Sequence, residues 1–451
     1  MKKIFQNRFT FLTLFSLLVI PQLNYSQFKE VVHPDWSKNI GVYEANVRQF
    51  TEEGTFAAFE KHLPRIKKLG VGILWFMPIH PIGKLNRKGT LGSYYSVKDY
   101  KAVNPEFGTL EEFKALVKKI HSMGMYVIID WVANHSAWDN VWVKSHPDFY
   151  TKDDDGNFVP PVPDWRDVID FDYSNKELWK YMIDAMKFWV EEADIDGFRC
   201  DVAAMVPTPF WNEARKELEK IKPVFMLAEA NEPELQKYAF DMTYNWKLKD
   251  IFNGIGKGSA DAEDIVDYYK YEKETYDEND YRMVFTTNHD ENTWHGTVKE
   301  RLGDGAEAFN VLIFLLPDMP LIYGGQEAGL SKRLDFFEKD KIDWSKFPYS
   351  EKFETLLALK KMNKALWNGN KGGEIKFLKN SDDEKILSFF REKDGGKIFA
   401  LFNLSDEEIN AEVETEFNGT FENLFSGKVI SIKGDYSVEL KPWEYQIFTG
   451  D

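Results

Sequence analysis

Short apolar runs alternate with helical patterns of apolar residues along most of the chain. Residues 71–78 and 125–132 are almost continuously apolar, as expected for strands that are buried on both faces of a parallel sheet. Further strand-like runs complete a set of eight, and they span residues 41–50, 195–202, 223–228, 240–244, 283–287 and 319–323. Most of these runs are followed by a helical pattern. Repeated strand–helix units predict an α/β fold, and eight of them favour a closed (β/α)8 TIM barrel.

An open, doubly wound sheet is the structural alternative to the barrel. No G-x-G-x-x-G motif or phosphate-binding loop follows any of the runs, which weakens that alternative. Local signals also predict where helices begin. Thr109 with Glu112, and Ser174 with Glu177, are spaced as capping boxes. A further helical pattern contains Pro64, which predicts a kink at that residue.

Two segments depart from the strand–helix alternation. Residues 135–172 lack a helical period and are too long for an ordinary loop, so we expect a small domain inserted after strand three. Beyond residue 370, strand-like runs punctuated by Gly and Asp predict an antiparallel β-sandwich domain. The expected order is signal peptide, first part of the barrel, inserted domain, remainder of the barrel and C-terminal domain, at residues 1–26, 27–134, 135–172, 173–370 and 371–451.

The first residues have the pattern of a secretory signal peptide. Lys2, Lys3 and Arg8 precede an apolar run over residues 9–20, and a polar stretch follows it. The run is too short to span a bilayer comfortably, and no second candidate follows. We therefore expect an exported protein, periplasmic or secreted, that is not inserted in a membrane.

Composition narrows the classes of partner. The formal net charge of -17 argues against nucleic acid and anionic membrane surfaces. Cys200 is the sole cysteine, so no internal disulfide can form. Its place within an apolar run predicts a buried, unreactive thiol.

Polar side chains gather where the predicted strands end. In a TIM barrel the carboxyl ends of the strands line the active site. A single carboxylate there could be an ordinary surface group, but a whole set of polar residues at these ends is poorly explained in that way. Arg199 and Asp201 are two residues apart and share one face of their strand, and a guanidinium beside a carboxylate favours its ionised form. The remaining members follow strands three, five and seven: Asp130, Asn134, His135, Glu229, Asn288, His289 and Asp290.

Four of these stretches, in this order and spacing, resemble the signature blocks of the α-amylase family, (β/α)8-barrel enzymes that act on α-glucosidic bonds. They read D-W-V-A-N-H, D-G-F-R-C-D, L-A-E-A and T-N-H-D, at residues 130–135, 196–201, 227–230 and 287–290. The resemblance implies Asp201 as nucleophile, Glu229 as general acid/base and Asp290 as the residue that stabilises the transition state. It also implies substrate binding by a further set: Tyr95, Asp130, His135, Arg199 and His289.

The two catalytic carboxyl groups also meet the physical requirements of retaining glycoside hydrolysis. One carboxylate must be ionised to attack the anomeric carbon, and the other must be protonated to release the leaving oxygen. Arg199 is expected to keep Asp201 ionised, and the apolar residues around Glu229 favour its protonated form. The chemistry requires no cofactor. A core role remains the alternative for Tyr95.

Other features of the sequence do not decide which glucan the protein prefers or whether it binds calcium. Ala204 and Met205 stand where starch-type relatives usually carry Lys-His. Asn134 matches one usual calcium ligand, although a structural turn explains it equally well, so a structural calcium ion is a possibility. We expect an α-glucan or malto-oligosaccharide hydrolase acting mainly on α-1,4 bonds. The alternatives are an exo-acting or oligosaccharide-preferring α-glucosidase, a transglycosylase and, with less support, a saccharide-binding relative without activity.

Overall fold

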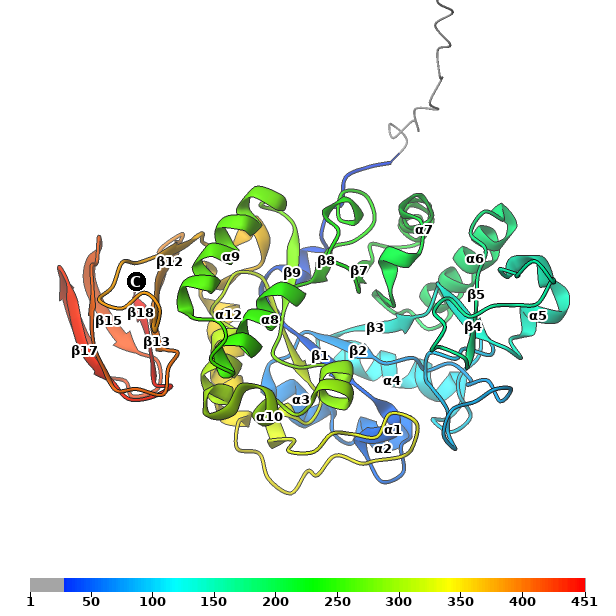
Figure 1. Cartoon of the computed structure of the whole chain (residues 1–451), viewed down its shortest axis with the longest axis horizontal. Helices are drawn as coiled ribbons and strands as arrows, with labels where there is room; N and C mark the ends of the chain where they lie inside the picture. The colour runs from blue at the N-terminus through cyan, green and yellow to red at the C-terminus, as the bar shows by residue number, and fades with distance from the viewer. Residues whose placement is uncertain (1–27, 451) are drawn as a thin grey trace, which may run out of the picture.

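The computed structural model describes residues 28–450, and its centre is a closed barrel of eight parallel strands (Figure 1). The strands are paired in the order β1-β10-β9-β8-β7-β6-β3-β2, and β2 pairs with β1 to close the ring. Their bounds are β1 Val42–Ala45, β2 Ile73–Phe76, β3 Tyr126–Trp131, β6 Gly197–Cys200, β7 Phe225–Ala228, β8 Met242–Tyr244, β9 Tyr281–Val284 and β10 Met319–Tyr323. The predicted TIM barrel is confirmed, and each predicted run contains or overlaps one strand.

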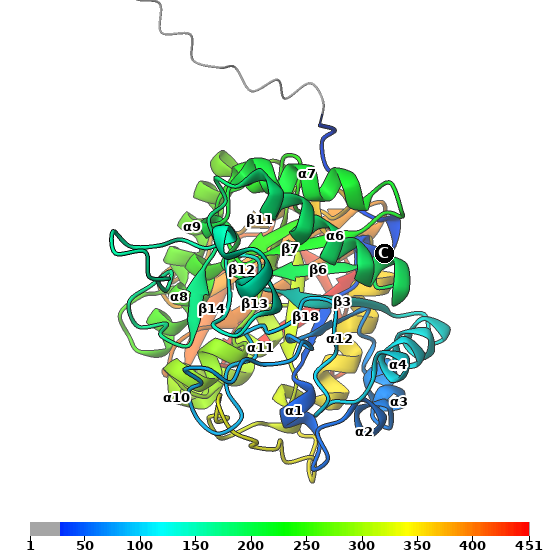
Figure 2. The same cartoon turned by 90° about the vertical axis from the view of Figure 1, so that its right-hand side faces the viewer.

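Helices surround the barrel strands (Figure 2). The helices are α1 Val47–Phe50, α2 Phe56–Glu60, α3 Leu63–Leu69, α4 Leu110–Ser122, α5 Val141–Ser145, α6 Lys176–Glu192, α7 Thr208–Leu218, α8 Trp246–Gly256, α9 Ala262–Thr275, α10 Val298–Leu302, α11 Ala306–Leu312 and α12 Ser350–Met362. Buried apolar side chains fill the space between these helices and the outer faces of the strands. A second apolar cluster, which includes Trp75, Phe225 and Met283, fills the inside of the barrel. The barrel is therefore a packed core rather than a pore.

Local sequence signals set some helix boundaries and mislead at others. The predicted capping box at Thr109 is present, because its side chain and that of Glu112 each accept a hydrogen bond from the other's backbone N–H. The box predicted at Ser174 is wrong, since Asn175 caps α6 instead and accepts from the N–H of Glu177. The predicted kink at Pro64 is a complete break between α2 and α3. Proline lies in the first turn of α3, where its missing N–H costs nothing.

The two segments that depart from the alternation lie at opposite ends of the molecule (Figure 1). After β3 the inserted segment contains α5 and a two-stranded antiparallel sheet of β4 His135–Ala137 and β5 Val168–Asp170. The C-terminal domain has a six-stranded sheet and a two-stranded sheet, whose facing side chains enclose an apolar core. Its strands are β11 Ile375–Phe377, β12 Ile386–Lys393, β13 Gly396–Asn403, β14 Ile409–Val413, β15 Asn418–Asn423, β16 Val429–Lys433, β17 Tyr436–Leu440 and β18 Tyr445–Gly450. The predicted C-terminal antiparallel domain is confirmed.

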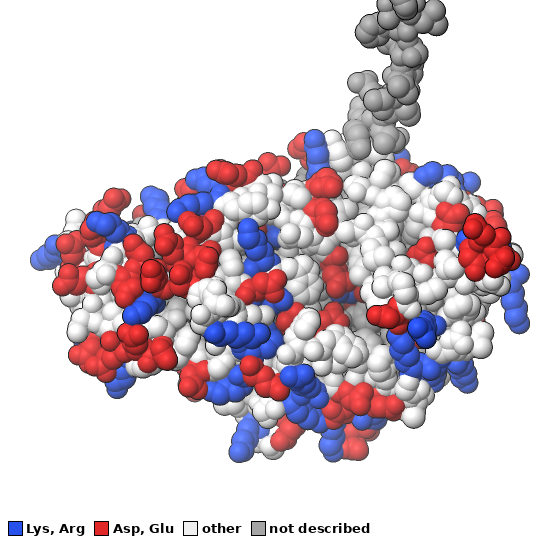
Figure 3. Space-filling model, in the orientation of Figure 1, with Lys and Arg blue, Asp and Glu red and all other residues white. Residues whose placement is uncertain are grey.

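The surface is acidic and mixed in sign. Figure 3 shows acidic and basic side chains intermixed over the barrel, with acidic ones gathered over the C-terminal domain at the left. Across residues 28–450 no helix is long and apolar enough to cross a membrane. The predicted signal peptide at residues 1–26 lies outside the described residues.

Candidate active site

A cavity of about 550 Å³ opens at the carboxyl ends of the barrel strands. Six of the predicted site residues line it: Tyr95, His135, Asp201, Glu229, His289 and Asp290. They come from the segments after five of the strands, so only closure of the barrel brings them together. The volume is in the usual range for small-molecule sites.

Arg199 lies beneath the cavity and contacts three carboxylates. It has no exposed surface. Nη1 donates to Asp130 Oδ1 and to Asp201 Oδ1, each at 3.0 Å. Nη2 is 2.9 Å from Glu229 Oε2, as an ion pair without the alignment of a hydrogen bond. One buried guanidinium therefore places the expected nucleophile and the expected acid/base beside each other.

The local fold that carries this arginine depends on one glycine. Gly197 opens β6 with φ of +151°, and a Cβ at that position would be 1.8 Å from the carbonyl oxygen of Phe225. Any other residue would therefore push β6 away from β7. The close pairing of these two strands sets the distance from Arg199 and Asp201 to Glu229.

The expectation that Arg199 keeps Asp201 ionised needs correction. Burial, followed by the neighbouring Glu229 carboxylate, raises the pKa of Asp201 well above its usual range, and Arg199 offsets this only in part. Ionising Asp201 beside Glu229 brings two negative charges together in a buried site, which is why its pKa is raised in spite of Arg199. Two adjacent carboxyl groups are what retaining glycoside hydrolysis requires, one as the nucleophile and one as the acid/base.

His289 is held between two carboxylates. Its Nδ1 is 2.5 Å from Glu44 Oε1, and its Nε2 is 3.1 Å from Asp290 Oδ2. Burial lowers the pKa of His289, but Asp290 and Glu44 outweigh that effect and raise it well above the usual value. Conversely, burial raises the pKa of Asp290, and the His289 charge overcomes it and lowers that pKa to about 2. The site therefore holds an imidazolium and an ionised Asp290 at neutral pH.

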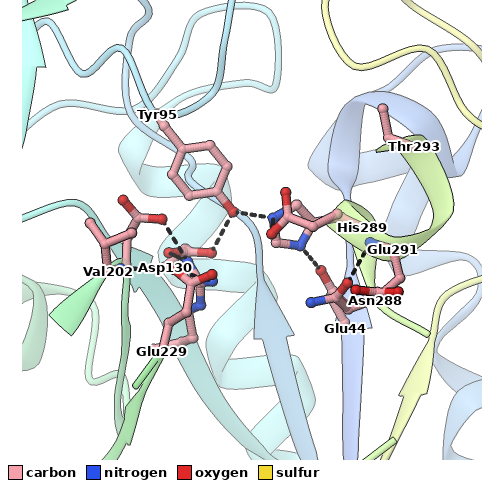
Figure 4. A network of polar contacts seen from close by, with 12 residues as sticks. Glu44, Tyr95, Asp130, Val202, Glu229, Asn288, His289, Glu291 and Thr293 are labelled. Atoms are coloured by element: carbon pink, nitrogen blue, oxygen red, sulfur yellow. Dashed lines mark hydrogen bonds and ion pairs between the residues drawn. The ribbon is translucent and has the colours of Figure 1, made fainter. Parts of the chain in front are cut away.

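Tyr95 lies between His289 and Asp130 and contacts both (Figure 4). Its hydroxyl is 2.8 Å from His289 Nε2 and donates to Asp130 Oδ2 at 3.1 Å. With His289 protonated, the imidazolium donates to the tyrosine oxygen and the tyrosine donates to Asp130. Burial raises the pKa of Asp130 to about 6, against the opposing charges of Arg199 and His289. This chain of contacts fixes the tyrosine ring at the cavity wall.

Val202 follows the expected nucleophile in a strained conformation. Its φ of +36° and ψ of 49° lie in the left-handed region, which costs a β-branched residue about 1–3 kcal/mol. In this conformation its backbone N–H donates to Glu229 Oε2 at 2.8 Å. The strain thus turns a main-chain donor toward the expected acid/base.

Some predicted residues lie outside the cavity lining. Asp130 and Arg199 are fully buried below it, so they are placed to position other groups rather than to touch a sugar. His135 lines the cavity, with Nε2 4.0 Å from Asp201 Oδ2, and burial lowers its pKa to about 3, which leaves a neutral ring. Asn134 contacts His135 Nδ1. Among the described residues, no group of three or more His, Cys, Asp or Glu side chains could hold a metal ion.

Sequence reasoning missed several residues of the site. Glu44 could have been suspected, because it is a single acid inside an otherwise apolar strand. Phe336 and Phe337 follow no strand directly, and no local pattern points to them. Trp165 and Trp294 lie close to the motifs in the sequence. That closeness alone does not distinguish a residue that lines the site from one that packs in the core. All four aromatic residues line the cavity.

Comparisons with known proteins agree with this architecture. Residues 28–168 and 163–366 match the family model of the α-amylase catalytic domain, and residues 375–447 match that of the maltogenic amylase C-terminal domain. A noncanonic maltogenic α-amylase from Thermotoga neapolitana has 32% identity and a TM-score of 0.85, covering 92% of this chain and 99% of that one.

Two further relatives are similar over most of the chain. An α-amylase from Lactobacillus plantarum has 32% identity and a TM-score of 0.82, covering 92% of this chain and 100% of that structure. Alpha-amylase 2 of Dictyoglomus thermophilum is 27% identical over 442 residues, which is 88% of this chain and 74% of the relative. The catalytic-domain model spans well over half of the chain, and the barrel carries all four signature stretches at its strand ends. The chain therefore belongs to the α-amylase family and is a glycoside hydrolase of that type.

Proposed function

We propose that this enzyme hydrolyses α-1,4-glucosidic bonds of starch-like glucans or malto-oligosaccharides with retention of configuration. The observation that carries the proposal is the contact of Asp201 and Glu229 with a single buried guanidinium at the edge of the cavity. Two carboxyl groups held by one guanidinium can supply both the nucleophile and the acid. The names of the relatives support the substrate class.

The first half-reaction forms a covalent intermediate. Asp201 attacks the anomeric carbon while Glu229 donates its proton to the leaving oxygen, so one carbon–oxygen bond forms as the other breaks. As positive charge develops on the sugar ring, the ionised Asp290 stabilises it. Arg199 neutralises the charge left on the Glu229 carboxylate, which it contacts at 2.9 Å.

The second half-reaction returns the enzyme to its starting state. Glu229 takes a proton from water, whose oxygen attacks the anomeric carbon and releases Asp201. An acceptor sugar hydroxyl in place of water would give transglycosylation through the same intermediate. The Val202 N–H keeps Glu229 in one position through both steps.

Two isosteric variants test the proposal. Glu229→Gln should lower kcat on soluble starch by about 10²–10⁴-fold, the usual contribution of a general acid, and Asp201→Asn should abolish the covalent step. The matched control is Glu234→Gln, which changes an exposed carboxyl group on the same segment. NMR of the first-formed product should show the α-anomer. Near-normal turnover in either folded variant, or a β-anomer, would reject the mechanism.

We also propose that the protein is exported. Lys2, Lys3 and Arg8 followed by an apolar run support cleavage of residues 1–26. The test is N-terminal sequencing of the protein recovered outside the cytoplasm, where the mature chain should begin at or near Gln27. A full-length chain retained in the cytoplasm would contradict it.

A further inference from the structure

The segment that follows β7 carries Glu229, and residues 229–232 form neither a helix nor a strand. Contacts with other parts of the chain therefore decide where the Glu229 carboxyl group lies. The N–H of Ala203 donates to the carbonyl oxygen of Glu229 at 3.1 Å, and the N–H of Tyr244 donates to that of Ala230 at 3.0 Å. A further set of contacts comes from outside the barrel and binds Asn231.

Arg282 supplies one of these outer contacts from β9. Its two neighbours in that strand belong to the apolar cluster inside the barrel. Successive side chains of a strand point to opposite faces, so Arg282 points outward, toward the helices. In the strand register Arg282 pairs with Thr243, and Thr243 pairs with Ala228, the residue before Glu229. The Arg282 side chain therefore begins in the same row of the sheet as the end of β7, two strands away.

The guanidinium of Arg282 crosses β8 and binds Asn231. Its Nη1 contacts the hydroxyl oxygen of Thr243, and its Nη2 donates to Asn231 Oδ1 at 2.7 Å. Its Nε donates to Glu272 Oε1 on α9 at 3.0 Å. Arg282 is only 2% exposed, so water competes little for these bonds. Asn231 is thus held by a charge-assisted hydrogen bond, which is stronger than a bond between neutral groups.

The charge of Arg282 is maintained by its surroundings. Burial lowers the pKa of Arg282, but the Glu272 carboxylate and the neighbouring tyrosines outweigh that effect and raise it above its usual value. Arg282 in turn offsets part of the rise that burial causes in the pKa of Glu272. Removing the arginine would leave Glu272 buried without its ion-pair partner, so an Arg282 variant changes the stability of the fold as well as the contact with Asn231.

Tyr276 binds Asn231 a second time. The Tyr276 ring packs on the Arg282 guanidinium, with 3.9 Å between Cζ and the ring centroid. Its hydroxyl donates to the main-chain carbonyl oxygen of Asn231 and lies 3.3 Å from Asn231 Oδ1. Asn231 is therefore held at both its main chain and its side chain, although the residue itself is exposed. An exposed asparagine contributes little to the apolar core, so these contacts fix the path of the chain rather than fill space.

We propose that Arg282 and Tyr276 are positioning residues for Glu229, and that they act through Asn231. They fix the segment after β7 so that the Glu229 carboxyl group stays within reach of the leaving oxygen. None of these three residues lines the cavity, so their effect on the reaction passes through Glu229. Displacing a catalytic group by about 1 Å can cost about 10²-fold in rate. The inference rests on the proposed function, in which Glu229 protonates the leaving oxygen.

The test compares substrates that differ in their need for the acid. The sugar leaving group of maltotetraose needs a proton, whereas the fluoride of α-maltosyl fluoride departs with little assistance. Asn231→Ala should lower kcat/KM by about tenfold on maltotetraose and by less than about twofold on the fluoride. Asn231→Asp keeps the oxygen that accepts from Arg282 and should restore kcat/KM on maltotetraose to within about twofold of wild type. A purely structural role would lower kcat/KM on both substrates alike.

Two further variants and a control complete the series. Tyr276→Phe keeps the ring on the guanidinium and removes the hydroxyl, so it should show the same selectivity to a smaller degree. Arg282→Met should show it most strongly, and the exposed Asn231→Ala keeps the proposal testable if Arg282→Met fails to fold. Asn418→Ala changes an exposed asparagine of β15 and should leave kcat/KM on both substrates unchanged. Circular dichroism of each variant checks that it is folded.

Glu229→Gln distinguishes failure of this proposal from failure of the proposed function. It should lose far more kcat/KM on maltotetraose than on α-maltosyl fluoride, because only the first substrate needs the acid. If Glu229→Gln shows this selectivity while folded Asn231→Ala loses activity equally on both substrates, or on neither, the positioning proposal is overturned and the proposed function stands. If Glu229→Gln does not discriminate between the substrates, Glu229 is not the acid, and the proposed function and the positioning proposal are both overturned.

Discussion

Replacing Arg199 with methionine should cost the folded protein a large part of its stability. Methionine keeps the length of the side chain and removes a charge that lies 3.0, 3.0 and 2.9 Å from the oxygens of Asp130, Asp201 and Glu229. Arg199 has no exposed surface, so water cannot replace it. Removing one partner of a buried ion pair costs about 3–5 kcal/mol, and we expect at least this loss at pH 7.

The pH dependence of that loss identifies its cause. Asp130 titrates at about 6 with Arg199 in place, and without the guanidinium its folded pKa rises further. A carboxyl group whose folded pKa is raised binds more protons folded than unfolded, so stability falls as pH rises toward that pKa. Between pH 6 and 8 the free energy of unfolding of the variant should therefore fall relative to wild type. The expected fall is about 1.4 kcal/mol per pH unit for each additional proton that the folded variant keeps on a carboxyl group.

Urea unfolding followed by tryptophan fluorescence at pH 6, 7 and 8 measures both effects. Arg166→Met removes an exposed arginine and should stay within about 0.5 kcal/mol of wild type. Arg199→Lys keeps the charge and should lose less stability than Arg199→Met. A loss below about 1 kcal/mol at pH 7, or an equal loss at pH 6 and pH 8, would refute the electrostatic account.

Three further predictions concern other parts of the site. Glu44→Gln removes a charge that raises the pKa of His289, so the imidazolium loses its proton at a lower pH. The alkaline limb of the kcat/KM profile should therefore shift to lower pH, and an unshifted limb would contradict this role. Gly197→Ala places a Cβ against the Phe225 carbonyl and should abolish soluble, folded protein, whereas Gly156→Ala, also at positive φ but with nothing within 4 Å, should fold; circular dichroism of both separates the clash from backbone strain. Incubation with EDTA should leave the melting temperature unchanged, because residues 28–450 contain no cluster of three or more His, Cys, Asp or Glu side chains that could hold a metal ion. A fall reversed by Ca²⁺ would establish a site built from other oxygen ligands.

The sequence by itself determined the barrel and, through its resemblance to the α-amylase family, which residues are expected at the site. Strand positions follow from apolar runs such as residues 125–132. These runs can be recognised in the sequence because burial on both faces of a strand excludes polar side chains. The order of strands and helices then leaves few topologies. Each motif follows its strand directly, so Asp201, Glu229 and Asp290 could be assigned to one end of the barrel before any contact was known.

Only the tertiary structure decided how those groups interact. Glu44 and His289 are 245 residues apart, and their contact exists because β1 closes the ring beside β10. The raised pKa of Asp201 also depends on distance and burial, which no local pattern encodes. The same holds for the contacts of Lys88 with Asp167 and of Thr90 with Glu338, which join residues far apart in the sequence. Periodicity reports which face of an element is buried, whereas electrostatics and the shape of a cavity depend on groups brought together by the fold.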